Sequence, residues 1–257
     1  MVVIMQKVFD FLEKDLIAHE NRFDAFSNNK PIEEESQIIV EENTGKRLSE
    51  VLIDAGISSD KIAVWVGPGH IQAFTQGIPN CMVIDSEDDD VKRMLVDAFS
   101  SNLIRFYYGE DMLGNEIGAA AKNVIGIAAG MLDGYGLSTL KGALMSRGCR
   151  EIARLISAMG GNELSAYGLC HLGDYEATVF SKFSHNREFG ERFVKEEKLD
   201  KLAEGYYTVK ALMGLSREYA VDMPICRSVY EIIYEGKDAK QALSGLFNRE
   251  ITTEFYK

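Results

Sequence analysis

The stretch EIGAAAKNVIGIAAG, from Glu116 to Gly130, decides how the second half of this chain folds. Its alanines, glycines and branched residues predict a long helix, with Val124 and Ile127 on the face that meets the core. Lys122 is the one charged residue that follows Glu116 in this stretch. Residues three and four apart share a helix face, so Lys122 projects from a patch of small or apolar side chains. Such a lysine is either an acid–base group beside a cleft or a stem that covers apolar surface while its head reaches water.

Composition limits the class of protein. With 257 residues, 46% of them hydrophobic, the chain can bury enough surface for two domains. The net charge of −12 and the absence of a basic run argue against nucleic acid or an anionic membrane as a partner. The longest apolar run, Val124 to Leu132, is too short to span a bilayer, and Met1 begins no signal-peptide pattern. The cysteines are widely spaced, which predicts reduced thiols in a cytoplasmic protein and no metal site.

The pattern of the chain changes near residue 110. Before it, short runs rich in β-branched and aromatic residues alternate with helical pattern, which predicts an α/β layer. These expected strands are Met1–Met5, Gln37–Val40, Ile62–Val66, Cys81–Ile84 and Leu103–Tyr108. A helix is expected over Thr44–Gly56. After residue 110 only helical spacing remains, and one helix ends at Gly160-Gly161. The sequence therefore predicts an α/β domain over residues 1–110 and an all-helical domain over residues 111–257.

Three further stretches carry polar residues of interest. In SEDDDVKRMLVDAF, Ser86 as an N-cap with Asp89 three residues later predicts a helix start in preference to a metal site. In SKFSHNREFGERF, a loop enters a helix at Ser184, where free amides and polar side chains suit a phosphate, although Ser184 or Asn186 also suits a simple cap. In VWVGPGH, Gly67 ends a buried-type strand, at a ligand-binding edge or in an ordinary turn.

Several blocks together resemble the soluble NAD(P)-dependent glycerol-3-phosphate dehydrogenases. They are TGKRLSEVL, VGPGHIQAFTQGIPN, EIGAAAKNVIGIAAGMLDGYG, LGDYEATVFSKFSHNREFGERF, AEGYYTVKAL and MPICRSVYEIIYEG. The resemblance covers the chain from about Thr44 onward. It implies an incomplete Rossmann-like domain followed by a helical substrate domain of the 6-phosphogluconate-dehydrogenase C-terminal type. It also implies hydride exchange between dihydroxyacetone phosphate and sn-glycerol 3-phosphate with NAD or NADP, a supply of glycerophospholipid precursor, and a homodimer.

The resemblance assigns roles residue by residue. Lys122 matches the catalytic lysine, with Asp174 as its catalytic partner. The substrate would be bound by Lys122 and Asp174 together with Gly67, Asn123, Thr178, Ser184, His185 and Asn186. The cofactor would lie near Arg187, Leu202 and Glu204. His171 and Trp65 are expected to be structural.

The chain also departs from the family pattern. Its first 40 residues contain no GxGxxG motif, so we expect the pyrophosphate-binding βαβ unit to be missing. The Lys-Gly pair that normally precedes Glu41 is absent, Gly69 replaces a serine, and His185 replaces an arginine, which exchanges a permanent charge for a ring that is mostly neutral at pH 7. Two hypotheses follow: a dehydrogenase, shortened or truncated, with reduced or no turnover, or a non-catalytic relative that binds a triose phosphate or dimerises.

Overall fold

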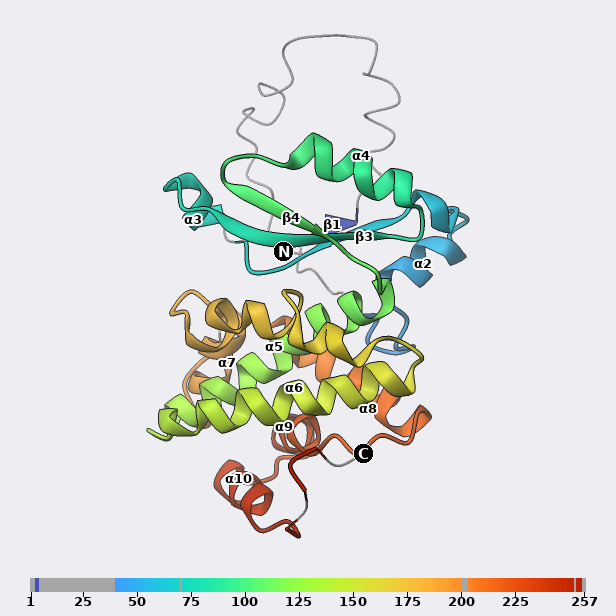
Figure 1. Ribbon diagram of the computed structural model, residues 1–257. Coiled ribbons are helices and arrows are strands. Elements are labelled where there is room, and N and C mark those ends of the chain that lie inside the picture. The colour runs from blue at the N-terminus through green and yellow to red at the C-terminus, as the bar shows by residue number, and fades with distance from the viewer. Residues whose placement is uncertain (1–2, 5–39, 70, 200–202, 252, 256–257) are drawn as a thin grey trace.

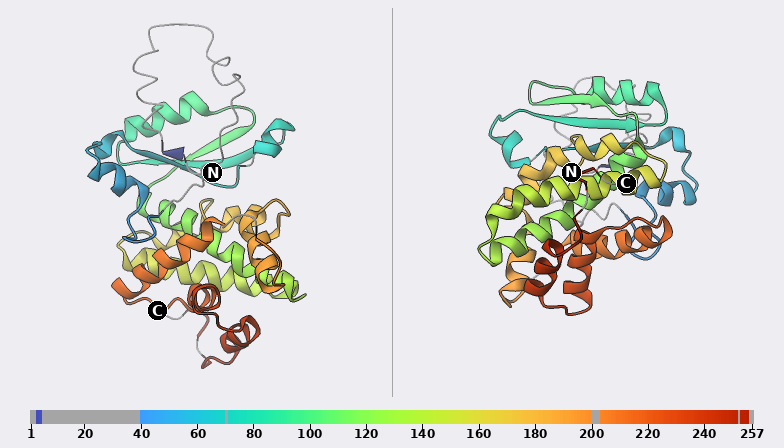
Figure 2. Two further views of the ribbon diagram at one scale, coloured as in Figure 1. Left: turned by 180° about the vertical axis from the view of Figure 1, so that it is seen from behind. Right: turned by 60° about the horizontal axis from the view of Figure 1, so that its bottom comes forward.

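The chain forms a small sheet layer stacked on a larger helical layer (Figure 1). The computed structural model describes residues 3–4, 40–69, 71–199, 203–251 and 253–255. Helix α4 (Asp89–Phe99) covers the outer face of the sheet, and the helical layer lies against the other face. Both views in Figure 2 keep this order, with α4 and the sheet above the helical layer.

The sheet is mixed. Its strands β1 (Val3–Ile4), β2 (Ala63–Val66), β3 (Asn80–Ser86) and β4 (Ile104–Tyr108) lie in that order. Strands β1 and β3 both pair antiparallel with β2, whereas β4 pairs parallel with β3. These four strands lie where the sequence predicts four of its five strands. Most of the fifth, Gln37–Val40, lies outside the described residues, and Val40 forms an isolated bridge with Arg47. Among the described residues, one strand pair, β3 with β4, is parallel.

The two faces of the sheet serve two different cores. Ala63 and Trp65 pack with Leu95 of α4, which confirms Trp65 as a core residue. The alternate residues Val66 and Val83 pack into the core of the helical layer. Because successive side chains of a strand point to opposite faces, one buried sheet joins α4 to the helices.

Helix α5 (Met112–Gly134) is the centre of the helical layer. Its residues from Gly114 to Leu132 are buried, including Val124 and Ile127 as predicted. The helices around it are α6 (Lys141–Ala158), α7 (His185–Val194), α8 (Glu204–Glu218), α9 (Pro224–Tyr234) and α10 (Ala239–Phe247). Short helical turns join them: η3 (Ser138–Leu140), η4 (Glu163–Tyr167), η5 (Leu172–Asp174) and η6 (Glu176–Phe180). The described residues beyond residue 110 contain no strand, so the predicted plan of an α/β layer followed by an all-helical part is confirmed.

Two predicted helix starts are wrong. Helix α2 covers Leu48–Asp54 and does not begin at Thr44, because Gly45 has a φ of +71°. That left-handed backbone conformation interrupts a helix. The smaller elements of this region are η2 (Ser59–Lys61) and α3 (Ile71–Thr75).

Helix α4 is capped by Asp88 and not by Ser86. The Asp88 carboxylate accepts the amides of Asp90 and Val91 at 2.8 and 3.1 Å. Ser86 is the last residue of β3, and its hydroxyl donates to the Ile62 carbonyl at 2.7 Å. Because Ser86 is part of the sheet and its hydroxyl is bonded to Ile62, it does not cap α4.

A buried carboxylate ties α2 to α5. Glu116, fully buried, accepts the amide and hydroxyl of Ser49 at 3.0 and 2.6 Å and the guanidinium of Arg47 at 2.8 Å. Burial nevertheless raises the pKa of Glu116 above its usual range. Through Glu116, the stretch Glu116–Gly130 thus holds the start of α2 against α5.

Among the described residues, no helix is both long and apolar enough to cross a bilayer. The four cysteines are all free, three of them buried.

Candidate active site

Lys122 of α5 and Asp174 of η5 form a buried ion pair. Lys122 is 8% exposed, and Asp174, the last residue of η5, is 3% exposed. The Lys122 ammonium Nζ bonds the Asp174 carboxylate Oδ2. Opposite charges attract more strongly away from water, and each would be costly to bury alone. The lysine head is therefore paired inside the protein and does not reach out to water.

Two glycines of α5 admit other segments to this pair. A Cβ on Gly118 would lie 2.8 Å from the Sγ of Cys170, and a Cβ on Gly126 would lie 2.8 Å from Thr178 Cγ2 and 3.1 Å from Asn186 Cβ. Real side chains essentially never approach that closely, so both positions need glycine. The small residues around Lys122 thus let neighbouring segments approach the helix.

The start of α8 is bonded to both α5 and α7. Asn123 donates through Nδ2 to Glu204 Oε2 at 2.9 Å, and Asn186 accepts the Gly205 amide at 2.8 Å. Glu204 and Gly205 are the first two residues of α8. Amide side chains on two helices therefore hold the N-terminus of the third.

The structure places six of the predicted site residues in a cluster around α5, as two bonded pairs and two residues that pack beside Gly126, on α5, η5, η6, α7 and α8. They are Lys122, Asn123, Asp174, Thr178, Asn186 and Glu204. All but Glu204 are buried. Their functional roles stay predictions.

Ser184 and His185 lie at the N-terminus of α7. The Ser184 hydroxyl accepts the Arg187 amide at 3.3 Å, so the capping interpretation of this serine is confirmed. His185 is exposed. Neither is bonded to the cluster, and their predicted contacts with substrate stay predictions.

Arg187 is bonded by protein groups on every side. Its guanidinium donates to Asp133 at 2.9 Å, to Glu191 at 2.8 Å and to the Ser181 carbonyl at 3.1 Å. Asp133 also accepts Lys141 at 2.6 Å. Nothing in this geometry supports the predicted cofactor role of Arg187, which stays a prediction.

Gly67 has a packing reason of its own. Its φ is +134°, and a Cβ there would lie 3.1 Å from the Met82 Cα of β3. Open α/β sheets bind ligands at the carboxyl ends of their parallel strands. Because β2 runs antiparallel to β3, the carboxyl end of β2 lies at the opposite edge of the sheet from the carboxyl ends of β3 and β4. A substrate contact at Gly67 stays a prediction, and Leu202 lies outside the described residues.

The strand-to-helix turns before α4 and before α5 do not fit a dinucleotide. A pyrophosphate needs free backbone amides at a helix N-terminus. The first amides of α4 are bonded by Asp88, and α5 is capped by Asp111, whose carboxylate accepts the Gly114 amide at 3.1 Å. A phosphate at either turn would meet a carboxylate already in place. Neither of these two turns therefore forms a pyrophosphate site.

His171, expected to be structural, has two hydrogen-bond partners. Its ring bonds the Gly118 carbonyl and the hydroxyl of Tyr175, four residues along the chain. The spacing of four between a histidine and a tyrosine, across Asp174, is the signal that could have revealed the pair.

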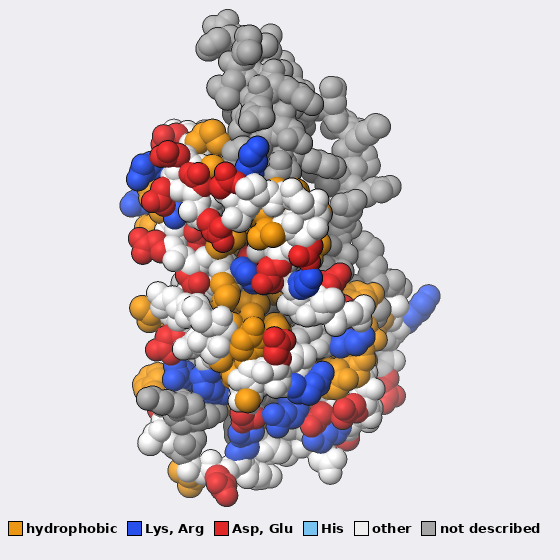
Figure 3. Space-filling view, turned by 90° about the vertical axis from the view of Figure 1, so that its right-hand side faces the viewer, with side chains coloured by type: hydrophobic (Ala, Val, Ile, Leu, Met, Phe, Trp, Pro, Cys, Tyr) orange, Lys and Arg blue, Asp and Glu red, His pale blue; other side chains and the backbone are white. Residues whose placement is uncertain are grey.

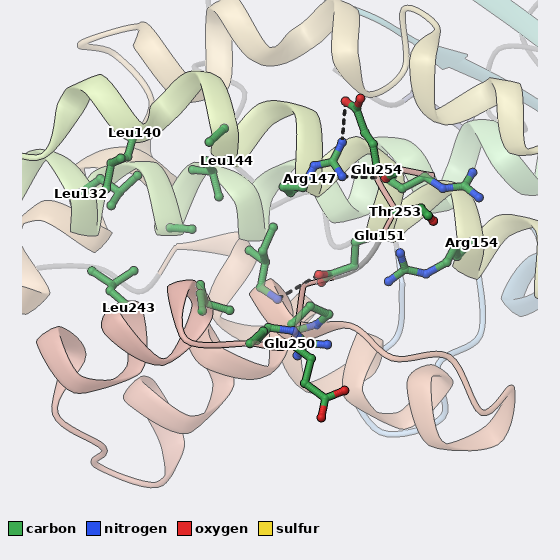
Figure 4. A pocket seen from close by; sticks show the side chains of 17 residues that line it. Leu132, Leu140, Leu144, Arg147, Glu151, Arg154, Leu243, Glu250, Thr253 and Glu254 are labelled. Carbon is green, nitrogen blue, oxygen red and sulfur yellow. Dashed lines mark hydrogen bonds and ion pairs between the residues drawn. The ribbon is translucent and has the colours of Figure 1, made fainter. Parts of the chain in front are cut away.

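A cavity of about 330 Å³ lies away from this cluster, between α6, α9, α10 and the tail (Figure 4). None of the predicted site residues lines it. Arg147, Arg150 and Arg154 of α6 line it together with Arg249 of the tail, and Figure 3 shows basic side chains on the lower half of one face of the molecule. Arg147 donates to the carboxylate of Glu254, Arg150 to that of Glu163 and Arg249 to that of Asp222, whereas Arg154 donates to the backbone carbonyl of Asp222.

Comparison with known proteins adds sequence and structural relatives. Residues 111–244 match the family model described as the NAD-dependent glycerol-3-phosphate dehydrogenase C-terminus. The glycerol-3-phosphate dehydrogenase [NAD(P)+] of Chlorobium limicola is 37% identical over 227 residues, which are 84% of this chain and 68% of that protein. The enzyme of the same name from a Thermotoga species is 37% identical over 225 residues, with the same coverage of 84% and 68%.

Solved structures of glycerol-3-phosphate dehydrogenases are also similar to this chain. The glycerol-3-phosphate dehydrogenase crystal structure from Coxiella burnetii superposes with a TM-score of 0.68 at 30% identity, over 73% of this chain and 60% of that one. The Plasmodium falciparum glycerol-3-phosphate dehydrogenase, with a TM-score of 0.71 at 19% identity over 85% of this chain and 65% of that one, shows the same fold. The chain thus spans about two thirds of the length of its curated relatives.

The helical layer with its lysine–aspartate pair lies against a sheet, as expected for an NAD(P)-dependent oxidoreductase. The relatives place the chain in this class of enzyme. Within that class, the chain belongs to the NAD-dependent glycerol-3-phosphate dehydrogenase family.

Proposed function

We propose that this chain interconverts dihydroxyacetone phosphate and sn-glycerol 3-phosphate, with NAD(H) or NADP(H) as the redox partner. The observation that carries the proposal is the buried Lys122–Asp174 pair on α5 and η5, with the buried amide side chains of Asn123 and Asn186 on α5 and on the adjoining α7. The names of the curated relatives support the same reaction class.

Lys122 is the proton carrier of this proposal. Reduction of the ketone adds a hydride to C2 and a proton to its oxygen, and the described residues account for the proton. The ammonium donates to the oxygen and stabilises the developing alkoxide, and in the reverse direction the neutral amine accepts the hydroxyl proton. Asp174 aligns the ammonium and balances its charge in a site with little water.

The phosphate end of the substrate needs donors beyond Lys122. The amide side chains of Asn123 and Asn186 and the hydroxyl of Thr178 are the polar groups of the cluster. The N-terminus of α7, with Ser184 and His185, adds backbone amides and the positive end of a helix dipole. We assign the phosphate to this end of α7.

A second candidate function is a non-catalytic module that binds a triose phosphate. It is favoured by one observation: the turns before α4 and α5 are capped by the carboxylates of Asp88 and Asp111, so neither turn offers a pyrophosphate site. Both candidates use the same substrate cluster. The domain division at residues 110 and 111, the homodimer and the cytoplasmic location remain predictions of the sequence.

The test measures oxidation of NADH and of NADPH at 340 nm by the full chain with dihydroxyacetone phosphate. We expect Lys122→Ala to lower turnover by about a hundredfold or more, the range for loss of an acid–base group. The control is Lys210→Ala, which removes an exposed lysine paired with Glu42 and leaves turnover unchanged. Equal turnover in Lys122→Ala and the unmodified chain would refute the assigned role.

Calorimetry with sn-glycerol 3-phosphate separates the two candidates. A chain that binds this ligand through Asn186 but oxidises neither NADH nor NADPH is the binding module. A chain that turns over, and loses turnover with Lys122, is the dehydrogenase.

A further inference from the structure

Asp174 is flanked by two fully buried polar rings. His171 precedes it by three residues and Tyr175 follows it directly, and both are 0% exposed. His171 Nδ1 lies 2.7 Å from the Gly118 carbonyl of α5, and His171 Nε2 lies 2.6 Å from the Tyr175 hydroxyl. The two rings meet edge to face, with centroids 4.9 Å apart. A continuous hydrogen-bonded chain therefore runs from α5 through both ends of the turn that carries Asp174.

The direction of each hydrogen bond follows from the chemistry. A carbonyl only accepts, so Nδ1 of His171 carries the proton and donates to Gly118. In the neutral ring Nε2 then accepts, so the Tyr175 hydroxyl donates to it. Burial keeps the ring neutral, because it lowers the pKa of His171 to about 4. The pair adds no charge to compete with the nearby Lys122.

The neighbouring helices leave room for both rings. A Cβ on Gly118 would lie 3.2 Å from the Cβ of His171, and a Cβ on Gly148 of α6 would lie 3.2 Å from the Tyr175 hydroxyl. Glycine thus stands where each ring meets a helix. The His171–Tyr175 pair is therefore closely fitted between α5 and α6.

The contact point on α5 is one turn before Lys122. In an α-helix the carbonyl of residue 118 also accepts the amide of residue 122, so the turn bonded to His171 is the turn that carries the lysine. We propose that His171 and Tyr175 are positioning residues that hold η5 so that the Asp174 carboxylate meets the Lys122 ammonium. The proposal rests on the proposed function for its effect on turnover, and on the contact geometry alone for its effect on Lys122.

Substitutions of His171 separate its hydrogen bond from its volume. An asparagine places its amide nitrogen about where Nδ1 stands, so His171→Asn keeps the donor to Gly118, whereas His171→Leu removes it. We expect His171→Leu to lower kcat about 10- to 100-fold, the range for a displaced catalytic group, with KM for dihydroxyacetone phosphate unchanged. His171→Asn restores kcat to within about threefold of the unmodified chain, a rescue that loss of packing alone would not give.

A second readout needs no turnover. Acetic anhydride labels free amines, and mass spectrometry gives the rate at Lys122. We expect slow labelling in the unmodified chain and in His171→Asn, and labelling about tenfold faster in His171→Leu, because the lysine loses its carboxylate partner. The matched control is Ser216→Ala, which changes a buried polar group of α8 that is bonded to the Val221 carbonyl and leaves both kcat and the labelling of Lys122 unchanged.

The outcomes separate the two proposals. An unmodified chain without turnover counts against the dehydrogenase, while the labelling rates still report on the position of Lys122. Labelling of Lys122 at the same rate in folded His171→Leu as in the unmodified chain overturns the positioning role. If His171→Leu does not fold, Tyr175→Phe removes a single hydroxyl, and faster labelling of Lys122 is again the expected result and equal labelling the contrary one.

Discussion

Gly130 of α5 and Gly190 of α7 lie where the two helices cross. A Cβ on Gly130 would stand 1.9 Å from the Arg187 carbonyl oxygen, and a Cβ on Gly190 would stand 2.0 Å from the Ile127 carbonyl oxygen. The obstacles are backbone atoms, which cannot move aside as a side chain does. These two residues therefore set how closely α7, with its predicted substrate residues, approaches the helix of Lys122.

Gly130→Ala is expected to lower the free energy of unfolding by about 3 kcal/mol, because the added methyl group forces the two helices apart. Gly214→Ala is the matched control: it also lies inside a helix, α8, and nothing lies within 4 Å of its Cβ position. That substitution should stabilise the chain by up to about 1 kcal/mol, since alanine favours a helix over glycine. Urea unfolding measures both, and a Gly130→Ala chain as stable as the Gly214→Ala chain would contradict the crossing.

The sequence showed that small and apolar residues surround Lys122, but it did not show which segments pack against them. The period of the helix follows from local spacing, so the small residues near Lys122 could be recognised. Asp174, 52 residues further on, could not be placed against the lysine by any local rule. Only the resemblance to a family suggested that partner, because packing between distant segments depends on the whole fold.

The start of helix α4 shows that local sequence patterns do not decide which residue caps a helix. Both Ser86 and Asp88 suit a cap, and the spacing to Asp89 favoured Ser86. Ser86 pairs with Ala63 across the sheet, and its hydroxyl is bonded to the Ile62 carbonyl. Strand pairing is non-local, so the sequence could predict that a helix begins here but not which residue caps it. The order and direction of the strands escaped prediction for the same reason.

Asp88→Ala should therefore cost about 1 kcal/mol of stability, because two amides of α4 lose their acceptor. Asp88→Asn keeps a capping oxygen and should cost only a small part of that. Chemical unfolding of the two variants beside the unmodified chain gives the difference. If Asp88→Ala unfolds at the same urea concentration as Asp88→Asn, the cap is elsewhere.

At the scale of the whole molecule, a carboxylate of α6 caps α9. Glu151, 1% exposed, accepts the amide of Ile225 at 2.9 Å (Figure 4). It also accepts the amide of Cys226 at 2.9 Å. The N-cap residue of α9, Met223, offers no side-chain acceptor, so this distant carboxylate takes its place. Burial raises the pKa of Glu151 to about 6, even though both amides favour the charged form.

Glu151 and His171 give the stability of the molecule opposite dependences on pH. A carboxyl whose pKa rises from 4.5 to about 6 on folding binds more protons in the folded state, so stability falls as pH increases across that interval. A histidine whose pKa falls from 6.5 to about 4 on folding binds fewer, so stability increases with pH across that interval. The two effects oppose each other between pH 4.5 and 6.

Substituting Glu151 or His171 one at a time isolates the contribution of each to the pH dependence of stability. Relative to the unmodified chain, Glu151→Gln should gain about 2 kcal/mol of stability as pH rises from 4.5 to 6, because the penalty of ionising the buried carboxyl is gone. His171→Asn should instead lose about 3 kcal/mol relative to the unmodified chain between pH 4 and 6.5. Comparison with the unmodified chain cancels the other titrating groups, Asp85 and Glu116 among them. Urea unfolding at half-unit steps of pH measures both curves, and parallel curves for either variant and the unmodified chain would show that its group does not titrate as its burial requires.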